Sequence, residues 1–274
     1  MTISKCTTQG AELLKAGGIP NPRLESKIIM CTVLGLSPEE ALLRQDEQLL
    51  DSNRDIFQRL LLRRAKGEPL AYIIQTKEFY GMEFFVNNHV LIPRPDTEIM
   101  VEKVLENHKK SDSLEILELG VGSGCIIISL LKNLPYSKAL GIDLSKAALE
   151  IAQKNAENLK VAGRITFRQS NWYQNVTGKF DLIISNPPYV DSKLSGQINF
   201  EPKIALFAQK NGLANYYKIA AGIKNFLKKG GSCYVEIGIE SKESVTEIFS
   251  QSSLKVANVY KDLAQIDRCL RFVL

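Results

Sequence analysis

The residues best suited to chemistry are the tetrapeptide Asn186-Pro187-Pro188-Tyr189, which directly follows an apolar run ending at Ser185. The side chain of Asn186 and the backbone of Pro187 each offer a carbonyl acceptor, and the prolines hold φ at about −65° without offering N–H donors. Tyr189 can stack on a planar group. This rigid set of acceptors suits a planar amide or ring nitrogen. Hydrogen bonds to these acceptors strengthen as positive charge develops on the nitrogen, and they thereby stabilise the transition state. No strong base is therefore needed.

A glycine-rich loop lies earlier in the chain, with the sequence Gly120-Val121-Gly122-Ser123-Gly124. It separates an apolar run ending at Leu119 from an apolar helix predicted to begin at Cys125. Glycines let the backbone approach a ligand, and the helix start offers free N–H groups. The spacing differs from the fingerprint of dinucleotide sites, so it favours a nucleotide-type cofactor that carries an amino-acid carboxylate.

Two further residues follow predicted strands at the same edge of a sheet. Asp143 ends the second strand about 20 residues after the loop, where a carboxylate can accept hydrogen bonds from both ribose hydroxyls. The alternative is a tight turn with a helix-capping Asp. Trp172 follows the third strand after Asn171, and could stack on adenine. A core aromatic without a ligand is an equally good interpretation of Trp172.

The elements that must position these residues alternate between strand-like and helix-like runs from residue 95 onward. This alternation predicts βαβ units and a parallel sheet covered by helices, an α/β fold. The predicted strands are 114–119, 139–143, 165–168, 180–185, 232–237, 254–260 and 268–274, and the predicted helices begin at 125 and 147 and span 216–228.

Residues 1–75 have a different character, with apolar residues at helical spacing and Pro22 and Pro38 as helix starters. They predict a small helical bundle. Residues 76–94 are rich in β-formers in three runs, 79–80, 84–86 and 90–92, and predict a β-hairpin linker. The expected organisation is therefore 1–75, 76–94 and a catalytic domain, 95–274.

The composition is that of an ordinary globular protein, with 45% hydrophobic and 24% charged residues. The net charge of +5 is too small to indicate a nucleic-acid partner. The five cysteines are scattered and never spaced as a zinc or disulfide pattern. We therefore expect no metal, and we expect reduced thiols in a cytoplasmic protein. No apolar stretch is long enough for a membrane span. A monomer is expected.

Together, the glycine loop, Asp143 and the tetrapeptide resemble the class I methyltransferases that modify amide or exocyclic nitrogen. Further segments narrow the resemblance to the peptide chain release factor glutamine methyltransferase family. These segments are Gly67–Ile73, Phe79–Gly81, Leu91–Glu98 and Glu201-Pro202.

The resemblance implies a seven-stranded Rossmann-like domain, S-adenosylmethionine as cofactor and class 1 release factors as protein substrate. The reaction would be N5-methylation of the glutamine in the Gly-Gly-Gln motif. By the matched positions, the tetrapeptide would hold the glutamine, and cofactor contacts would come from the loop 120–124, Asp143, Trp172 and Asn186. The segment 94–98 would border the pocket, although a helix start with Asp96 as N-cap is at least as good physically.

Two other functions fit some of these residues. A nucleic-acid methyltransferase acting on adenine N6 or guanine N2 could use the same tetrapeptide for a flipped base. Arg59, Arg63, Arg64 and Lys66 could serve it, but such a run is more often a solvated helix face. A cofactor-binding module without turnover is the second alternative, and the intact Asn186 and Tyr189 argue against it.

Overall fold

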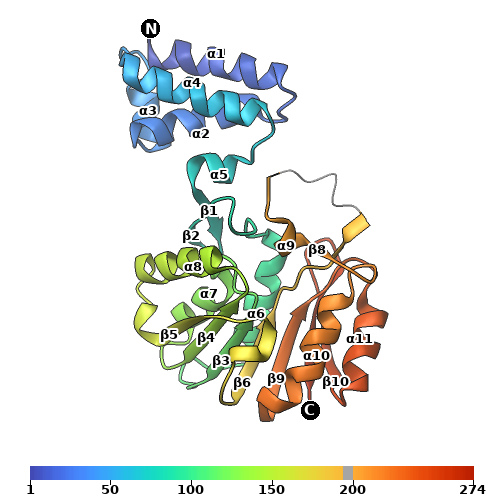
Figure 1. Cartoon of the computed structure of the whole chain (residues 1–274). Helices are drawn as coiled ribbons and strands as arrows, with labels where there is room; N and C mark the ends of the chain where they lie inside the picture. Colours follow the sequence, from blue (N-terminus) through green and yellow to red (C-terminus); the bar gives the residue numbers. More distant parts are fainter. Residues whose placement is uncertain (194–199) are drawn as a thin grey trace. The chain divides into compact units, whose positions relative to one another are not determined.

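The computed structural model describes residues 1–193 and 200–274, and it divides into two units, 1–76 and 77–274. The smaller unit is helical (Figure 1). Its helices are α1 (Ile3–Ala16), α2 (Pro22–Leu34), α3 (Pro38–Leu43), α4 (Asp51–Ala65) and α5 (Leu70–Ile74).

The helices of this unit begin at the residues that the sequence indicates. Pro22 and Pro38 occupy the first turns of α2 and α3, where a missing N–H costs nothing. Ser37 caps α3 in a capping box with Glu40. Apolar residues from α1, α2 and α4 form one core, which includes Leu14, Ile29 and Phe57.

The larger unit is built on a sheet of seven strands, as predicted. Its spatial order is β10-β11-β9-β6-β3-β4-β5; the five strands from β9 to β5 are parallel, and β11 and β10 run antiparallel to their neighbours. The bounds are β3 (Glu115–Leu119), β4 (Lys138–Asp143), β5 (Ile165–Gln169), β6 (Phe180–Ser185), β9 (Leu227–Glu236), β10 (Lys255–Lys261) and β11 (Asp267–Val273).

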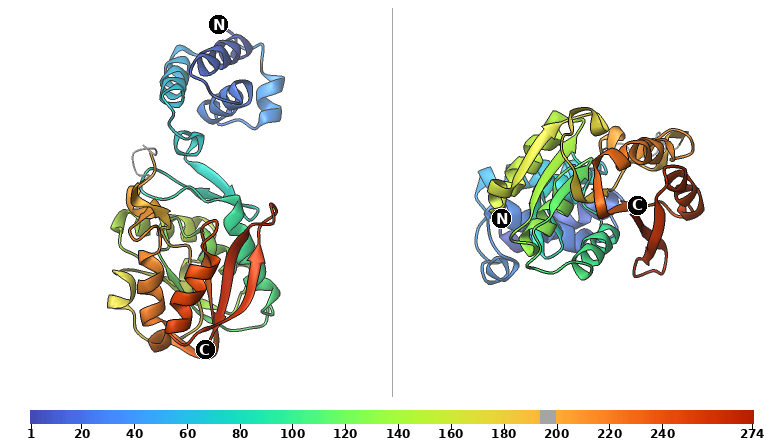
Figure 2. Two further views of the ribbon diagram at one scale, coloured as in Figure 1. Left: turned by 90° about the vertical axis from the view of Figure 1, so that its right-hand side faces the viewer. Right: turned by 90° about the horizontal axis from the view of Figure 1, so that it is seen from below.

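Helices cover both faces of this sheet, which explains why its central strands are apolar on both sides (Figure 2). In β6, Leu182 and Ile184 join one core and Ile183 the other. The predicted helix 216–228 ends two residues early, because Leu227 already pairs with Phe180 at the start of β9. The helices are α6 (Glu98–Glu106), α7 (Cys125–Asn133), α8 (Lys146–Asn158), α10 (Ala214–Phe226) and α11 (Lys242–Gln251).

The β-rich segment before the sheet forms a hairpin of β1 (Thr76–Phe79) and β2 (Met82–Phe85). The third β-rich run, 90–92, lies outside this hairpin. Instead of pairing with a strand, the N–H of Ile92 donates to a side chain, Glu201 Oε1, at 3.1 Å, and prolines at 93 and 95 prevent further ladder bonds.

Short elements complete the described chain. They are the 3₁₀ turns η1 (Pro95–Thr97), η2 (Ala162–Arg164) and η3 (Trp172–Asn175), the helix α9 (Lys203–Leu206), and the parallel pair β7 (Val190–Asp191) and β8 (Phe207–Ala208). Within residues 1–193 and 200–274, none of the helices has the length and apolar character that crossing a membrane requires.

Candidate functional site

A cavity of about 400 Å³ lies at the carboxyl edge of the parallel strands. Each of β3, β4, β5 and β6 ends at this edge and contributes residues from the segment that follows it, as expected for an open α/β sheet. The lining residues from these segments include Gly120, Val121, Gly122, Ser123, Asp143, Asn171, Trp172, Asn186 and Pro188.

The loop after β3 closely follows the sheet edge. The N–H groups of Gly120 and Val121 both donate to the carbonyl of Ile142, each at 2.9 Å. Gly124 has a φ of 81°, and a Cβ there would lie 2.8 Å from Ile128 Cδ1. A side chain at this position would strain the backbone and crowd Ile128, which explains why glycine stands at the helix start.

Asp143 is bound to this loop by its side chain. Its Oδ2 accepts from the N–H of Gly122 and its Oδ1 from the N–H of Ser145, both at 2.9 Å. Burial raises the pKa of Asp143, and these backbone bonds oppose the rise. A carboxylate offers about four acceptor sites, so the two bonds leave acceptor capacity for a diol in the cavity.

Asn155, on α8, holds the glycine-rich loop 120–124 through hydrogen bonds of its side-chain amide. Its Nδ2 donates to the carbonyls of Ser123 (2.9 Å) and Phe85 (3.0 Å), and its Oδ1 accepts from the N–H of Phe85 at 2.8 Å. The side chain is 1% exposed. The loop is thereby tied to the end of β2 through one amide.

Trp172 belongs both to a hydrophobic core and to the cavity wall. Its side chain packs against the apolar core under α10 and also lines the cavity. Its backbone has a φ of 53°, and its carbonyl accepts from the hydroxyl of Ser170 at 2.6 Å. Trp172 is the only tryptophan of the chain, so its fluorescence reports on this cavity.

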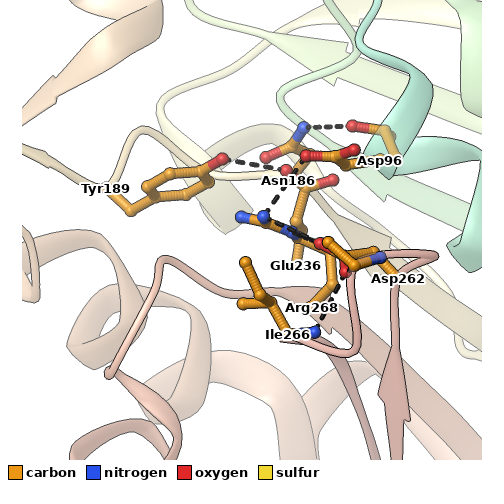
Figure 3. Close-up of polar contacts among 9 residues, drawn as sticks. Asp96, Asn186, Tyr189, Glu236, Asp262, Ile266 and Arg268 are labelled. Carbon is orange, nitrogen blue, oxygen red and sulfur yellow. Dashed lines mark hydrogen bonds and ion pairs between the residues drawn. The ribbon is translucent and has the colours of Figure 1, made fainter.

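The tetrapeptide after β6 is held by contacts from three other segments. Asn186 Nδ2 donates to Thr97 Oγ1 at 3.3 Å, and Asn215 Nδ2 donates to the carbonyl of Pro188 at 2.9 Å. Tyr189 is not among the residues that line the cavity, and its hydroxyl donates to Glu236 Oε1 at 3.0 Å (Figure 3). Asn186 and Pro188 thus face the cavity, whereas Pro187 is buried beneath it.

Gly212 packs directly against the backbone of this tetrapeptide. Its φ is 87°, and an added Cβ would lie 2.1 Å from the carbonyl oxygen of Tyr189. We expect Gly212→Ala to displace Tyr189, to lower the free energy of unfolding by about 1–3 kcal/mol and to reduce turnover. Urea unfolding followed by Trp172 fluorescence measures the first effect. The control is Gly163→Ala, where a Cβ meets nothing within 4 Å; equal losses in both variants would contradict the expectation.

The segment 94–98 borders the cavity, which Arg94 and Thr97 line. Arg94 forms an ion pair with Glu201. The alternative interpretation of Asp96 as an N-cap was wrong: Asp96 lies inside the turn η1 and pairs with Arg268 at 3.2 Å.

Sequence reasoning missed four residues that hold the site: Thr97, Asn155, Asn215 and Glu236. The sequence offered a signal for Glu236 alone, because an acidic residue stands at the end of the otherwise apolar run 232–237. Asn155 lies on a predicted helix and Asn215 directly before one, and nothing distinguishes either from an ordinary polar position.

Comparison with known families divides the chain in a similar way. Residues 6–74 match the family described as PrmC N-terminal domain, and residues 95–209 match the family described as Methyltransferase small domain.

Individual proteins match over almost the whole chain. The chain is 40% identical to a bifunctional methyltransferase of Rickettsia conorii over 99% of its own length, and it spans only 57% of that relative. It is 32% identical to the release factor glutamine methyltransferase of Agrobacterium fabrum, covering 99% of this chain and 97% of the relative. A methyltransferase structure from Pyrococcus furiosus shares the fold, with a TM-score of 0.54 at 18% identity over 81% of this chain and 98% of that one.

Proposed function

Because the chain belongs to the release factor glutamine methyltransferase family, we propose that it methylates N5 of the glutamine in the Gly-Gly-Gln motif of class 1 peptide chain release factors. The methyl donor is S-adenosylmethionine, whose sulfonium supplies a methyl group open to in-line displacement. The products are N5-methylglutamine and S-adenosylhomocysteine.

The residues at the cavity fit this cofactor. Asp143 retains acceptor sites for the two ribose hydroxyls, and Trp172 offers a ring face for adenine. The loop 120–124 presents glycines with positive φ, which allow a ligand to approach the backbone closely. Asn186 lines the same cavity and would stand between the cofactor and the substrate amide.

The tetrapeptide would hold the glutamine amide and direct its nitrogen. The lone pair of an amide nitrogen is delocalised, so the enzyme must stabilise the positive charge that develops as the nitrogen attacks. Asn186 Oδ1 and the carbonyl of Pro187 would accept the two N–H groups, and these bonds strengthen during attack. The proton leaves the nitrogen after transfer. Asn215 Nδ2 donates a hydrogen bond to the carbonyl of Pro188 and so helps to keep the tetrapeptide in one conformation.

A single observation carries this proposal. One cavity is lined both by the loop and the acid suited to the cofactor and by Asn186 and Pro188 of the tetrapeptide suited to the amide. The two reacting groups would therefore share one enclosed site. We also propose that residues 1–75 recognise the release factor, that 76–94 connect the parts, and that 95–274 catalyse. The protein would act as a cytoplasmic monomer without an obligate nucleic acid.

Methyl transfer from radiolabelled S-adenosylmethionine to a purified bacterial release factor tests the function. Label should enter the release factor and should be absent when Gln is replaced by Ala in its Gly-Gly-Gln motif. A bulk sample of DNA and structured RNA serves as the second acceptor. Label on nucleic acid alone would transfer the function to a base methyltransferase, whereas cofactor binding without any labelled acceptor would indicate a module without turnover.

A further inference from the structure

Glu236, the last residue of β9, is an acidic side chain buried behind the tetrapeptide. It is 2% exposed. Its Oε1 accepts from the hydroxyl of Tyr189, while its Oε2 has no hydrogen-bond partner among the described residues. A buried, incompletely satisfied carboxyl is costly, so its presence at this position requires an explanation.

A second route connects Glu236 to the cavity through Thr97. The hydroxyl of Thr97 accepts from Asn186 Nδ2, and it lies near enough to the carboxyl of Glu236 to lower its pKa. A hydroxyl has one hydrogen, so Thr97 can accept from Asn186 and direct that hydrogen toward the carboxylate. This arrangement turns Asn186 Nδ2 toward η1, and leaves Oδ1 as the acceptor for a group in the cavity.

We propose that Glu236 is a positioning residue for methyl transfer: its carboxylate holds Tyr189 directly and orients the amide of Asn186 through Thr97. The inference rests on the proposed function, since it assigns the Asn186 carbonyl to the attacking nitrogen. Figure 3 shows Tyr189, Glu236 and Asn186 close together, from the ends of two neighbouring strands.

The charges around Glu236 determine at which pH this arrangement forms. Burial raises the pKa of Glu236 to about 7, against hydrogen bonds from Thr97 and Tyr189 and the charge of Arg268; Asp96 raises it. The other titratable groups around it are Asp262, which pairs with Arg268, the partly buried Cys125, and the buried Tyr216 and Cys269.

Two opposite dependences on pH follow from the raised pKa. The orienting carboxylate forms only as the pH rises through about 7, so kcat should rise over this range. The free energy of unfolding behaves in the opposite way. Because the folded pKa lies above the ordinary value of 4.5, the contribution of Glu236 to stability is full below 4.5 and is lost as the pH rises through 7.

Glu236→Gln tests the proposal because it preserves size and removes the charge. The glutamine amide has a single acceptor oxygen, so it cannot accept from both Tyr189 and Thr97 as the two carboxylate oxygens can. We expect kcat at pH 8 to fall on the order of 100-fold, and its rise near pH 7 to disappear. The Kd for S-adenosylmethionine, from Trp172 fluorescence, should stay unchanged, and the free energy of unfolding at pH 8 should not decrease.

The matched control is Tyr234→Phe, on the same strand. It removes a buried hydroxyl that has no hydrogen-bond partner among the described residues, so kcat and its pH profile should stay as in the wild type. The proposal would be overturned if Glu236→Gln had the kcat of the wild type. It would also be overturned if the fall in kcat came with a fall in the free energy of unfolding large enough to account for it.

A stability cycle separates this inference from the proposed function. Glu236→Gln and Tyr189→Phe, alone and combined, should have non-additive effects on unfolding at pH 8, because removing the hydroxyl leaves the buried carboxylate without its donor. This measurement needs no methyl acceptor. Additive effects would refute the link between Glu236 and Tyr189, whereas failure to label a release factor would refute only the proposed function.

Discussion

Asn186→Ala is expected to lower kcat about 100- to 1,000-fold while the Kd for S-adenosylmethionine changes little. The side-chain carbonyl would stabilise positive charge that exists on the substrate nitrogen only during attack, so its loss affects the transition state more than the bound cofactor. Single-turnover methyl transfer at saturating cofactor measures the chemical step, and Trp172 fluorescence measures binding of the cofactor independently.

Asn158→Ala is the control for the removal of an asparagine side chain from the same unit. Asn158 is the exposed last residue of α8 and does not line the cavity. Its kcat and Kd should equal those of the wild type. A large rise in Kd with unchanged kcat in Asn186→Ala would reverse the assignment of Asn186 from the amide to the cofactor.

Asp143→Ala is expected to act on the cofactor instead. Each hydrogen bond to a charged group contributes about 1.5–3 kcal/mol, so losing one bond to the ribose should raise the Kd by roughly 10- to 100-fold, and losing both by more. The variant also removes the acceptor for the N–H of Gly122, which loosens the loop. At saturating cofactor, kcat should recover most of its wild-type value.

The pH dependence of cofactor binding gives a second test of Asp143. Its pKa is raised by burial, so protonation weakens the wild-type affinity at a higher pH than it would with an exposed Asp. Asp143→Asn should bind weakly at every pH and lack this dependence. Asp46→Asn, which removes an exposed carboxylate from the smaller unit, should behave as the wild type. An unchanged Kd in Asp143→Ala would exclude the ribose role.

Much of the fold could be predicted from the sequence, because two simple rules determine it. Runs such as Leu182–Ile184 are apolar at consecutive positions, which indicates a strand covered on both faces. Parallel strands all end at the same edge, so residues that follow different strands come together. For this reason Gly120, Asp143 and Asn186 could be expected in one place, although they are far apart along the chain.

The residues that support the site could not be found in this way. Asn155 binds Ser123, 32 residues earlier, and Phe85, 70 residues earlier, and such pairs depend on how a helix packs on the finished sheet. The run 90–92 has strand-like composition but lies outside the strands of the described chain. Composition predicts that a segment can be extended; whether it joins a sheet depends on which tertiary partners take its N–H groups.

The three hydrogen bonds of Asn155 also bear on the kinetics with which a cofactor is captured. Ordering the backbone of a flexible loop costs about 1–2 kcal/mol per residue in conformational entropy. Here the carbonyl of Ser123 is already fixed to α8, and Asp143 already fixes Gly122. The loop has therefore lost this freedom during folding, and association can proceed at a rate set by encounter without a slow closing step.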